Sequence, residues 1–136
     1  MLVGSDDHNV YALALDTGEE LWRFAAQDRV FASPSVAGAT TFVGSYDGFF
    51  YALDVASGAL RWKTDLGGTV LASAAIAADR IYVGSGSGHM ICLERGTGEV
   101  VWSHEVGDKV WSSPTVFGDW LWFGSHTGKV YALRQR

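Results

Sequence analysis

The apolar positions of this chain fall into short segments that are separated by turn residues. Within one stretch these segments are Arg29–Val36, Thr40–Ser45, Phe49–Asp54 and Ala59–Lys63. β-Branched and aromatic residues dominate them, and nowhere do ten or more residues show apolar positions spaced by three and four. The pattern therefore predicts four short strands and no helices.

Glycines mark the reversals between these segments. Asp47–Gly48 is typical of a tight hairpin that needs a positive φ angle. A second type of reversal is expected at Thr17–Gly18, Ser57–Gly58 and Thr97–Gly98. Each group of four strands should therefore form a small antiparallel meander.

Some predicted strands are apolar on both sides, as at Ile81–Val83 and Val130–Leu133. A sheet with one face in water would alternate apolar and polar residues. Both faces of these sheets are therefore predicted to be covered.

A repeat of 40 residues runs through the whole chain. The dipeptide Gly-Ser recurs with this spacing, and the same register aligns leucines, turn glycines and tryptophans. The aligned sets are Gly4, Gly44, Gly84 and Gly124; Leu13, Leu53, Leu93 and Leu133; Gly18, Gly58 and Gly98; and Trp22, Trp62 and Trp102.

A four-stranded repeat of this length that is covered on both faces predicts the blades of a β-propeller. A sandwich would not need a constant period. We therefore expect an all-β fold, a partial β-propeller of about 3.4 four-stranded blades (136/40), in one domain over residues 1–136. The expected divisions are a partial blade at 1–28, blades at 29–68 and 69–108, and a partial blade at 109–136.

The segment Ala12–Trp22 resembles the tryptophan-docking motif of the pyrroloquinoline quinone (PQQ)-like propeller repeat. Related copies run from Ala52 to Trp62 and from Cys92 to Trp102, although Cys92 replaces the usual alanine. The segments that begin at Val30, Val70 and Val110 resemble the innermost strand of that repeat, so the resemblance covers nearly the whole chain. The fourth copy ends at Arg136, before any Gly or Trp of the motif.

This resemblance implies that the motif tryptophans pack against the glycine turn and alanine of an adjoining blade. A buried Trp contributes a large apolar area and an N–H that needs a partner. The residues that would dock the blades are Trp22, Trp62, Trp102, Gly18, Gly58, Gly98, Ala12 and Ala52.

The other tryptophans occupy different positions of the repeat. Trp111 and Trp122 align with bulky apolar residues such as Phe31 and Phe42, which predicts core positions for both. Trp120 aligns with Thr40 and Arg80 and is expected at an exposed edge.

Quinoprotein dehydrogenases that resemble this repeat hold PQQ over a Trp, near adjacent cysteines and a calcium ion. Cys92 is the only cysteine of this chain and Asn9 the only asparagine, so this ligand set is missing. No helix is predicted after the glycine-rich Gly84–Gly88, which therefore does not indicate a nucleotide site. We expect no catalytic residue, no cofactor and no metal.

The predicted hairpins between the second and third strands of each blade meet the connections between blades at one rim. Loops on a rigid scaffold commonly carry binding residues. A weak metal site is the alternative for the rim histidines, and turn stabilisation is the alternative for the carboxylates. The candidate rim-binding residues are Asp7, His8, Tyr46, Asp47, His89 and His126.

Charge and hydropathy narrow the range of partners. The net charge is −5 and the basic residues are scattered singly, so nucleic acid is not expected as a partner. No apolar run approaches the roughly 18 residues needed to cross a bilayer. Met1–Val10 is typical of a folded domain, which predicts no signal peptide in this chain.

These observations favour a non-catalytic protein-interaction or scaffold module. One alternative is a fragment of a PQQ-dependent quinoprotein dehydrogenase, whose PQQ and calcium ligands lie outside this chain. Another is a repeat array without a partner of its own. The resemblance implies a periplasmic or extracellular location, and the two unpaired ends of the array predict self-association into a closed ring.

Overall fold

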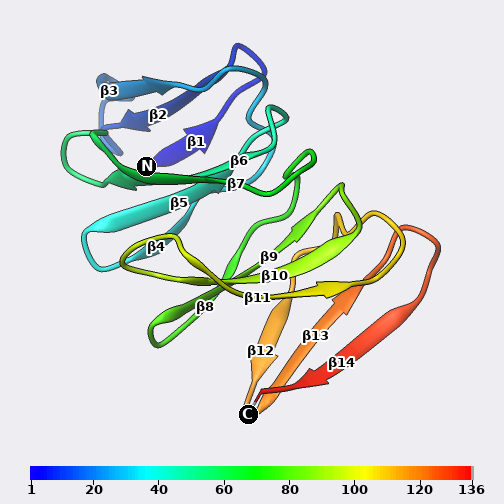
Figure 1. The fold of residues 1–136 in the computed structure, drawn as a ribbon. Coiled ribbons are helices and arrows are strands. Elements are labelled where there is room, and N and C mark those ends of the chain that lie inside the picture. Colours follow the sequence, from blue (N-terminus) through cyan, green and yellow to red (C-terminus); the bar gives the residue numbers. More distant parts are fainter. Residues whose placement is uncertain (136) are drawn as a thin grey trace.

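The computed structural model describes residues 1–135, which form four antiparallel sheets and no helix. The sheets follow one another along the chain, from β1–β3 to β12–β14 (Figure 1). The strands of the first two sheets are β1 (Leu2–Gly4), β2 (Asn9–Leu13), β3 (Glu20–Ala25), β4 (Ser35–Ala37), β5 (Thr40–Gly44), β6 (Phe49–Asp54) and β7 (Leu60–Asp65). Those of the last two are β8 (Ala75–Ala77), β9 (Arg80–Ser85), β10 (His89–Glu94), β11 (Val100–Glu105), β12 (Thr115–Phe117), β13 (Trp120–Gly124) and β14 (Val130–Arg134).

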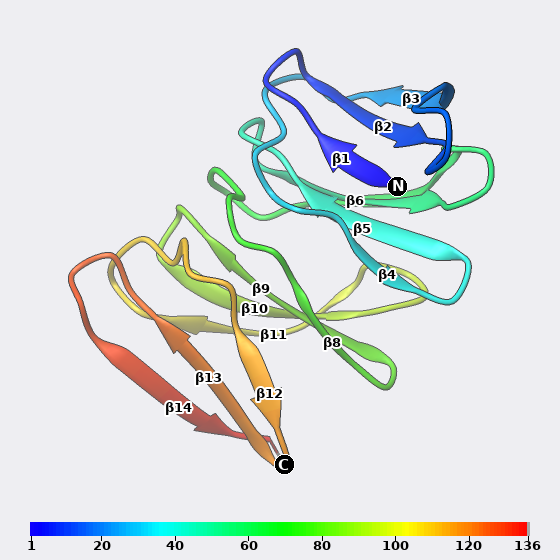
Figure 2. The ribbon, with the colours of Figure 1, turned by 180° about the vertical axis from the view of Figure 1, so that it is seen from behind.

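Every sheet is a meander whose strands pair in sequence order, and the two central sheets have four strands each. In the 40-residue register, β1–β3 correspond to β5–β7, and β12–β14 correspond to β4–β6. The sheets are arranged like a fan, and β8 contacts both β4 and β12 (Figure 2). The predicted all-β partial propeller is confirmed. No helix within residues 1–135 could cross a membrane.

The first strand of each repeat is shorter than predicted. Only Ser35–Ala37 of the second sheet pairs as a strand, whereas the sequence pattern extended it back to Arg29. The reason is that the backbone before Ser35 forms hydrogen bonds with residues in hairpins instead of pairing with a neighbouring strand. Val30 N donates to Ser5 O of the first sheet (3.0 Å), while Arg29 O accepts from Tyr46 N of the second (2.9 Å).

The hydrophobic core consists of three clusters, each between two consecutive sheets. In the central cluster, Phe42 and Phe50 of the second sheet pack with Ile81, Val83 and Leu93 of the third. One face of each sheet thus contributes alternate residues to one cluster, and the opposite face contributes to the next. This arrangement explains why Ile81–Val83 is apolar on both sides.

The last sheet departs from that arrangement, since only one of its faces is covered within residues 1–135. The prediction that both of its faces are covered was therefore wrong. Leu121 is fully buried, but Trp122 is 46% exposed and Val130 is 76% exposed. The equivalent Phe42 and Phe50 are buried by the third sheet. The predicted core position of Trp122 is therefore corrected: its face of β12–β14 has no neighbouring sheet within residues 1–135. Trp120, at 42%, is exposed as predicted.

The Gly-Ser dipeptide joins consecutive sheets. A Cβ atom on Gly44 would lie 2.2 Å from Cγ1 of Val70, in the segment that leads into the next sheet, so only glycine allows this approach. Ser45 is fully buried, and its Oγ lies 3.1 Å from the carbonyl oxygens of both Asp28 and Arg29. The packing between sheets thus explains the glycine and the serine at this position of the repeat.

The predicted turn glycines have left-handed backbone angles, including Gly48 at φ 89° and Gly58 at φ 72°. The equivalent of Gly48 in the first hairpin is His8, which adopts φ 75°. A side chain in this conformation costs about 1 kcal/mol relative to glycine.

We therefore expect His8→Gly to stabilise the protein by about 1 kcal/mol, because it removes this backbone strain. His126→Gly is the control, since His126 is not in the left-handed region. Chemical denaturation of both variants measures the difference. An equal effect of the two substitutions would argue against backbone strain at His8.

Candidate functional site

Two of the motif tryptophans lie on glycine turns of the next sheet. Trp22 Nε1 donates a hydrogen bond to Val55 O (2.9 Å), and a Cβ on Gly58 would lie 2.5 Å from the Trp22 ring. Trp62 repeats both contacts one sheet later, with Arg95 O (3.1 Å) and Gly98.

The other motif residues have different surroundings. Ala12 and Ala52 lie opposite Trp22 and Trp62 across the strand pairs of their own sheets. Gly18 keeps the left-handed turn geometry, with φ 74°, but a Cβ there would have no neighbour within 4 Å. Its turn is therefore open in this structure.

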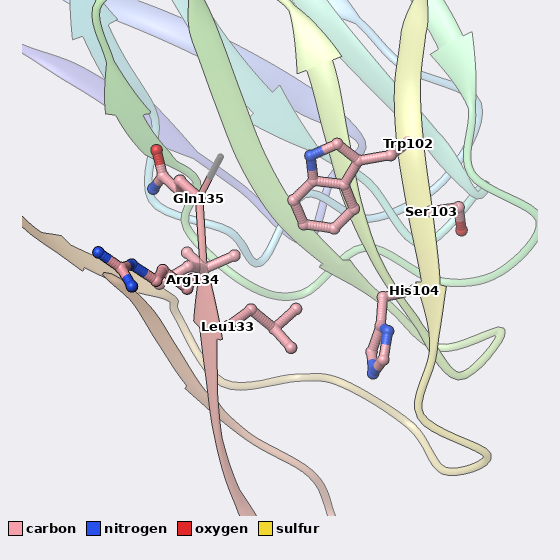
Figure 3. A pocket seen from close by; sticks show the side chains of 7 residues that line it. Trp102, Ser103, His104, Leu133, Arg134 and Gln135 are labelled. Carbon is pink, nitrogen blue, oxygen red and sulfur yellow. The ribbon is translucent and has the colours of Figure 1, made fainter. Parts of the chain in front are cut away.

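The third motif tryptophan, Trp102, faces a pocket of about 430 Å³ rather than a glycine turn. The pocket lies between β11 and β14, and Trp102, His104 and Leu133 point toward it (Figure 3). Its complete lining is Trp102, Ser103, His104, Leu121, Leu133, Arg134 and Gln135. Of these, only Trp102 was predicted from the sequence as a site residue. The 40-residue register marks His104 as the equivalent of Thr64, whose hydroxyl donates to Gly98 O (2.6 Å).

The predicted rim carboxylates are engaged in turn hydrogen bonds. Asp47 Oδ1 accepts from Phe49 N (2.8 Å), and its Oδ2 accepts from Tyr51 OH (2.6 Å) and from Gln27 N (3.0 Å). Burial and the bond to Asp47 raise the pKa of Tyr51. Asp47 thereby links its hairpin to Gln27, which lies in the segment between the first and second sheets.

Asp7 forms the same local bonds in the first hairpin. Its carboxylate accepts from Asn9 N (3.1 Å) and from Tyr11 OH (2.5 Å). The Tyr11 hydroxyl is the main reason that the pKa of Asp7 falls to about 2. The turn-stabilising interpretation of the rim carboxylates therefore holds for both aspartates.

Aromatic and basic side chains form two similar clusters on the rim. Arg29 lies 4.5 Å from the ring centre of Tyr46, which in turn is 5.4 Å from Phe31. Two repeats later, Lys109 lies 4.7 Å from the ring centre of Trp111, and the ring centres of Trp111 and His126 are 5.0 Å apart in an edge-to-face arrangement. Neither Arg29 nor Lys109 was predicted from the sequence as a rim-binding residue, although the two align with each other in the 40-residue register.

The remaining rim histidines stay in their own hairpins. His89 Nδ1 lies 3.2 Å from Ser87 Oγ, and His8 occupies the left-handed position of its turn. Within residues 1–135 no three His, Cys, Asp or Glu side chains are close enough together to hold a metal ion. The rim histidines are therefore not brought together as one site.

The described residues do not fit a PQQ and calcium site. Cys92 is 1% exposed, and burial raises its pKa to about 11, so it is a packed thiol and not a reactive one. No acidic cluster accompanies it among residues 1–135. The ligands that such a cofactor needs are not supplied by this part of the molecule.

A family model described as outer membrane protein assembly factor BamB matches residues 6–136. The chain belongs to this family. Its PQQ-like repeat, inferred from the spaced tryptophan motifs, is thereby confirmed. A sequence comparison with curated proteins gives no match.

Solved structures share the fold of this BamB family member. BamB from Moraxella catarrhalis superposes with a TM-score of 0.86 at 24% identity, over 98% of this chain and 42% of that chain. The computationally designed Ika4 protein gives 0.85 at 16% identity, over 99% and 84%. Quinohemoprotein alcohol dehydrogenase from Comamonas testosteroni gives 0.81 at 18% identity, over 92% and 27%. The chain thus spans less than half the length of BamB and of the dehydrogenase.

Proposed function

We propose that this chain is a non-catalytic protein-interaction or scaffold module, working in the periplasm or outside the cell. The observation that carries the proposal is the apolar face of β12–β14. Phe117 is 81% exposed, and it neighbours Trp120 across the β12–β13 pair. Trp120 and Trp122 lie 6.2 Å apart on the same face. Contiguous exposed apolar side chains are typical of protein contact surfaces.

The family supports this proposal, since its description names an outer membrane protein assembly factor. The two rim clusters around Tyr46 and His126 offer further contacts, because aromatic and arginine side chains are enriched at protein interfaces. Asp47 holds the hairpin of Tyr46 in place, and Asp7 does the same for the first hairpin. His8 contributes an exposed side chain to the same rim, and His89 a half-buried one.

We also propose that the chain associates with itself through its two terminal faces. The outer face of the first sheet presents Met1 and Val3, which are 60% and 39% exposed. Their equivalents in the third sheet, Ile81 and Val83, are the residues that cover Phe42 and Phe50. The first and last sheets therefore offer the two complementary halves of the contact that already joins the inner sheets. Two copies joined in this way give a ring of about eight blades.

Trp122→Glu tests this association. A carboxylate in the centre of the apolar face should oppose packing, because an unpaired buried charge is costly. We expect the wild-type chain to sediment as a dimer at high concentration and the variant as a monomer. Val101→Glu is the control: Val101 is 45% exposed on the outer strand β11, and Arg61 occupies the equivalent position. A wild-type chain that stays monomeric at all concentrations would refute the ring.

The dehydrogenase fragment is the competing function. The structural likeness to the alcohol dehydrogenase extends to the fold alone at 18% identity. A rise in melting temperature on adding PQQ with calcium would favour this alternative, because a ligand that binds only the folded state stabilises it. We expect no such rise.

A further inference from the structure

The contact between the second and third sheets leaves a pocket of about 280 Å³ beside their last strands, β7 and β11. This volume lies near the lower end of the range for small-molecule sites, about 300–1,000 Å³. The lining comes from β7, β10, β11 and the turns beside them, so both walls of the pocket belong to the two central sheets. The lining residues are Asp65, Leu66, Gly67, Ser87, His89, Ile91, Val100 and Ser103.

The same place in the contact between the first and second sheets is filled by aromatic side chains. In the 40-residue register, Tyr51 is the equivalent of Ile91. Phe49 is likewise the equivalent of His89. The rings of Phe24 and Tyr51 meet edge to face with their centres 5.2 Å apart, and Phe49 lies 6.1 Å from Tyr51. The smaller side chains of the third sheet therefore account for the pocket.

A hydrogen-bonded pair of side chains is also replaced at the pocket. Tyr51 OH donates to Asp47 Oδ2 (2.6 Å), and the first sheet has the same bond between its own tyrosine and aspartate. The register places Ser87 and Ile91 at these two positions of the third sheet. The phenol ring and its carboxylate partner are thus exchanged together for smaller residues.

The polar groups that line the pocket can hold a hydroxyl. Ser87 Oγ donates to Leu66 O (3.1 Å), so it accepts from Nδ1 of His89 at 3.2 Å. The other ring nitrogen of the half-buried His89, Nε2, is then an acceptor. Leu66 and Ile91, which are 4% and 5% exposed, contribute apolar surface. Apolar walls with one acceptor suit a planar ring that carries a hydroxyl.

We propose that this pocket binds a para-substituted phenol ring, the group that tyrosine carries. The ring would pack on Leu66 and Ile91, and its hydroxyl would donate to Nε2 of His89. This site uses neither the apolar face of β12–β14 nor the two rim clusters, so it goes beyond the proposed function. A small phenolic compound and a tyrosine side chain of another protein share this chemistry, and two probes separate these sources.

Titration of the ¹⁵N-labelled chain with 4-ethylphenol and with N-acetyltyrosinamide tests the site. We expect saturable shifts of the amide signals of Leu66, Gly67 and His89. Tighter binding of 4-ethylphenol would identify a small phenolic ligand as the source, and tighter binding of N-acetyltyrosinamide a tyrosine side chain. The counterparts without the hydroxyl, ethylbenzene and N-acetylphenylalaninamide, should bind about fivefold more weakly, because they cannot form the hydrogen bond.

Two variants copy residues of the second sheet into the third and should therefore keep the fold, which circular dichroism checks. Ile91→Tyr combined with Ser87→Asp should fill the pocket and abolish binding of both probes. His89→Phe should bind each phenol no better than its counterpart without the hydroxyl, since no ring nitrogen remains to accept the bond. A preference for the hydroxyl that survives His89→Phe would contradict the role of His89.

Trp122→Glu should bind the phenols like the wild type, even where it abolishes self-association. This control keeps a failure of the phenol site distinguishable from a failure of the proposed function. Absence of saturable binding to the wild-type chain, amide shifts confined to residues outside the pocket, or undiminished binding to the variant with the filled pocket would each overturn the proposal.

Discussion

Gly44→Ala should destabilise the protein by about 3 kcal/mol, whereas Gly124→Ala should leave the stability nearly unchanged. A Cβ on Gly44 would lie 2.2 Å from Val70 Cγ1 and 2.9 Å from Val70 O, and the backbone at Val70 cannot yield by that amount without losing its hydrogen bond to Ser45 O. Gly84→Ala should behave like Gly44→Ala, because its Cβ would lie 2.4 Å from Val110 O.

Gly124 is the matched control for this prediction. It has the same place in the repeat, but the nearest atom to its Cβ would be Lys129 O at 3.6 Å. Neither Gly44 nor Gly124 has a positive φ, so alanine adds no backbone strain at either position. Urea denaturation of the two variants gives the comparison. Similar unfolding midpoints would show that the close approach between sheets does not determine the effect.

Trp22→Ala should cost about 3–5 kcal/mol, the range for removing a large buried aromatic side chain. Trp22 is 9% exposed, its ring covers Gly58, and its N–H is bonded to Val55 O. Trp102→Ala should cost about 2 kcal/mol or less, because a pocket replaces the glycine turn on its ring. The same denaturation measurement ranks the two variants.

A conservative variant separates the two contributions of Trp22. Trp22→Phe keeps an aromatic ring on Gly58 but removes the hydrogen bond to Val55 O. We expect the loss of this bond to lower the free energy of unfolding by about 1 kcal/mol. Equal losses for Trp22→Ala and Trp102→Ala would mean that docking on the glycine turn adds nothing to the stability.

Both predictions follow from a core that is divided among the contacts between sheets. Each cluster joins only neighbouring sheets, so the stability is close to a sum of the contacts between them. Equivalent positions of the repeat therefore contribute to the contact between sheets, and through it to the stability, only where the next sheet is present. Within residues 1–135 the outer face of the last sheet carries the same type of contact residues without a covering sheet, so the proposed interaction surface would use the packing that stabilises the fold.

The sequence by itself determined the features that depend on local geometry and on the period. Turn glycines such as Gly48 and Gly58 are recognisable because few other residues adopt a positive φ. The spaced tryptophans identified the repeat, and the turn bonds of Asp7 and Asp47 were predicted from residue type alone.

Only the tertiary structure decided which copies of a repeated position are buried. Phe42 and Trp122 are equivalent in the sequence, yet one is buried and the other is 46% exposed, because burial depends on the adjoining sheet and not on the residue. The same reason distinguishes Gly44 from Gly124 and leaves Trp102 facing a pocket. The segment from Arg29 is apolar like a strand, but its backbone bonds to two hairpins that only the folded chain brings together.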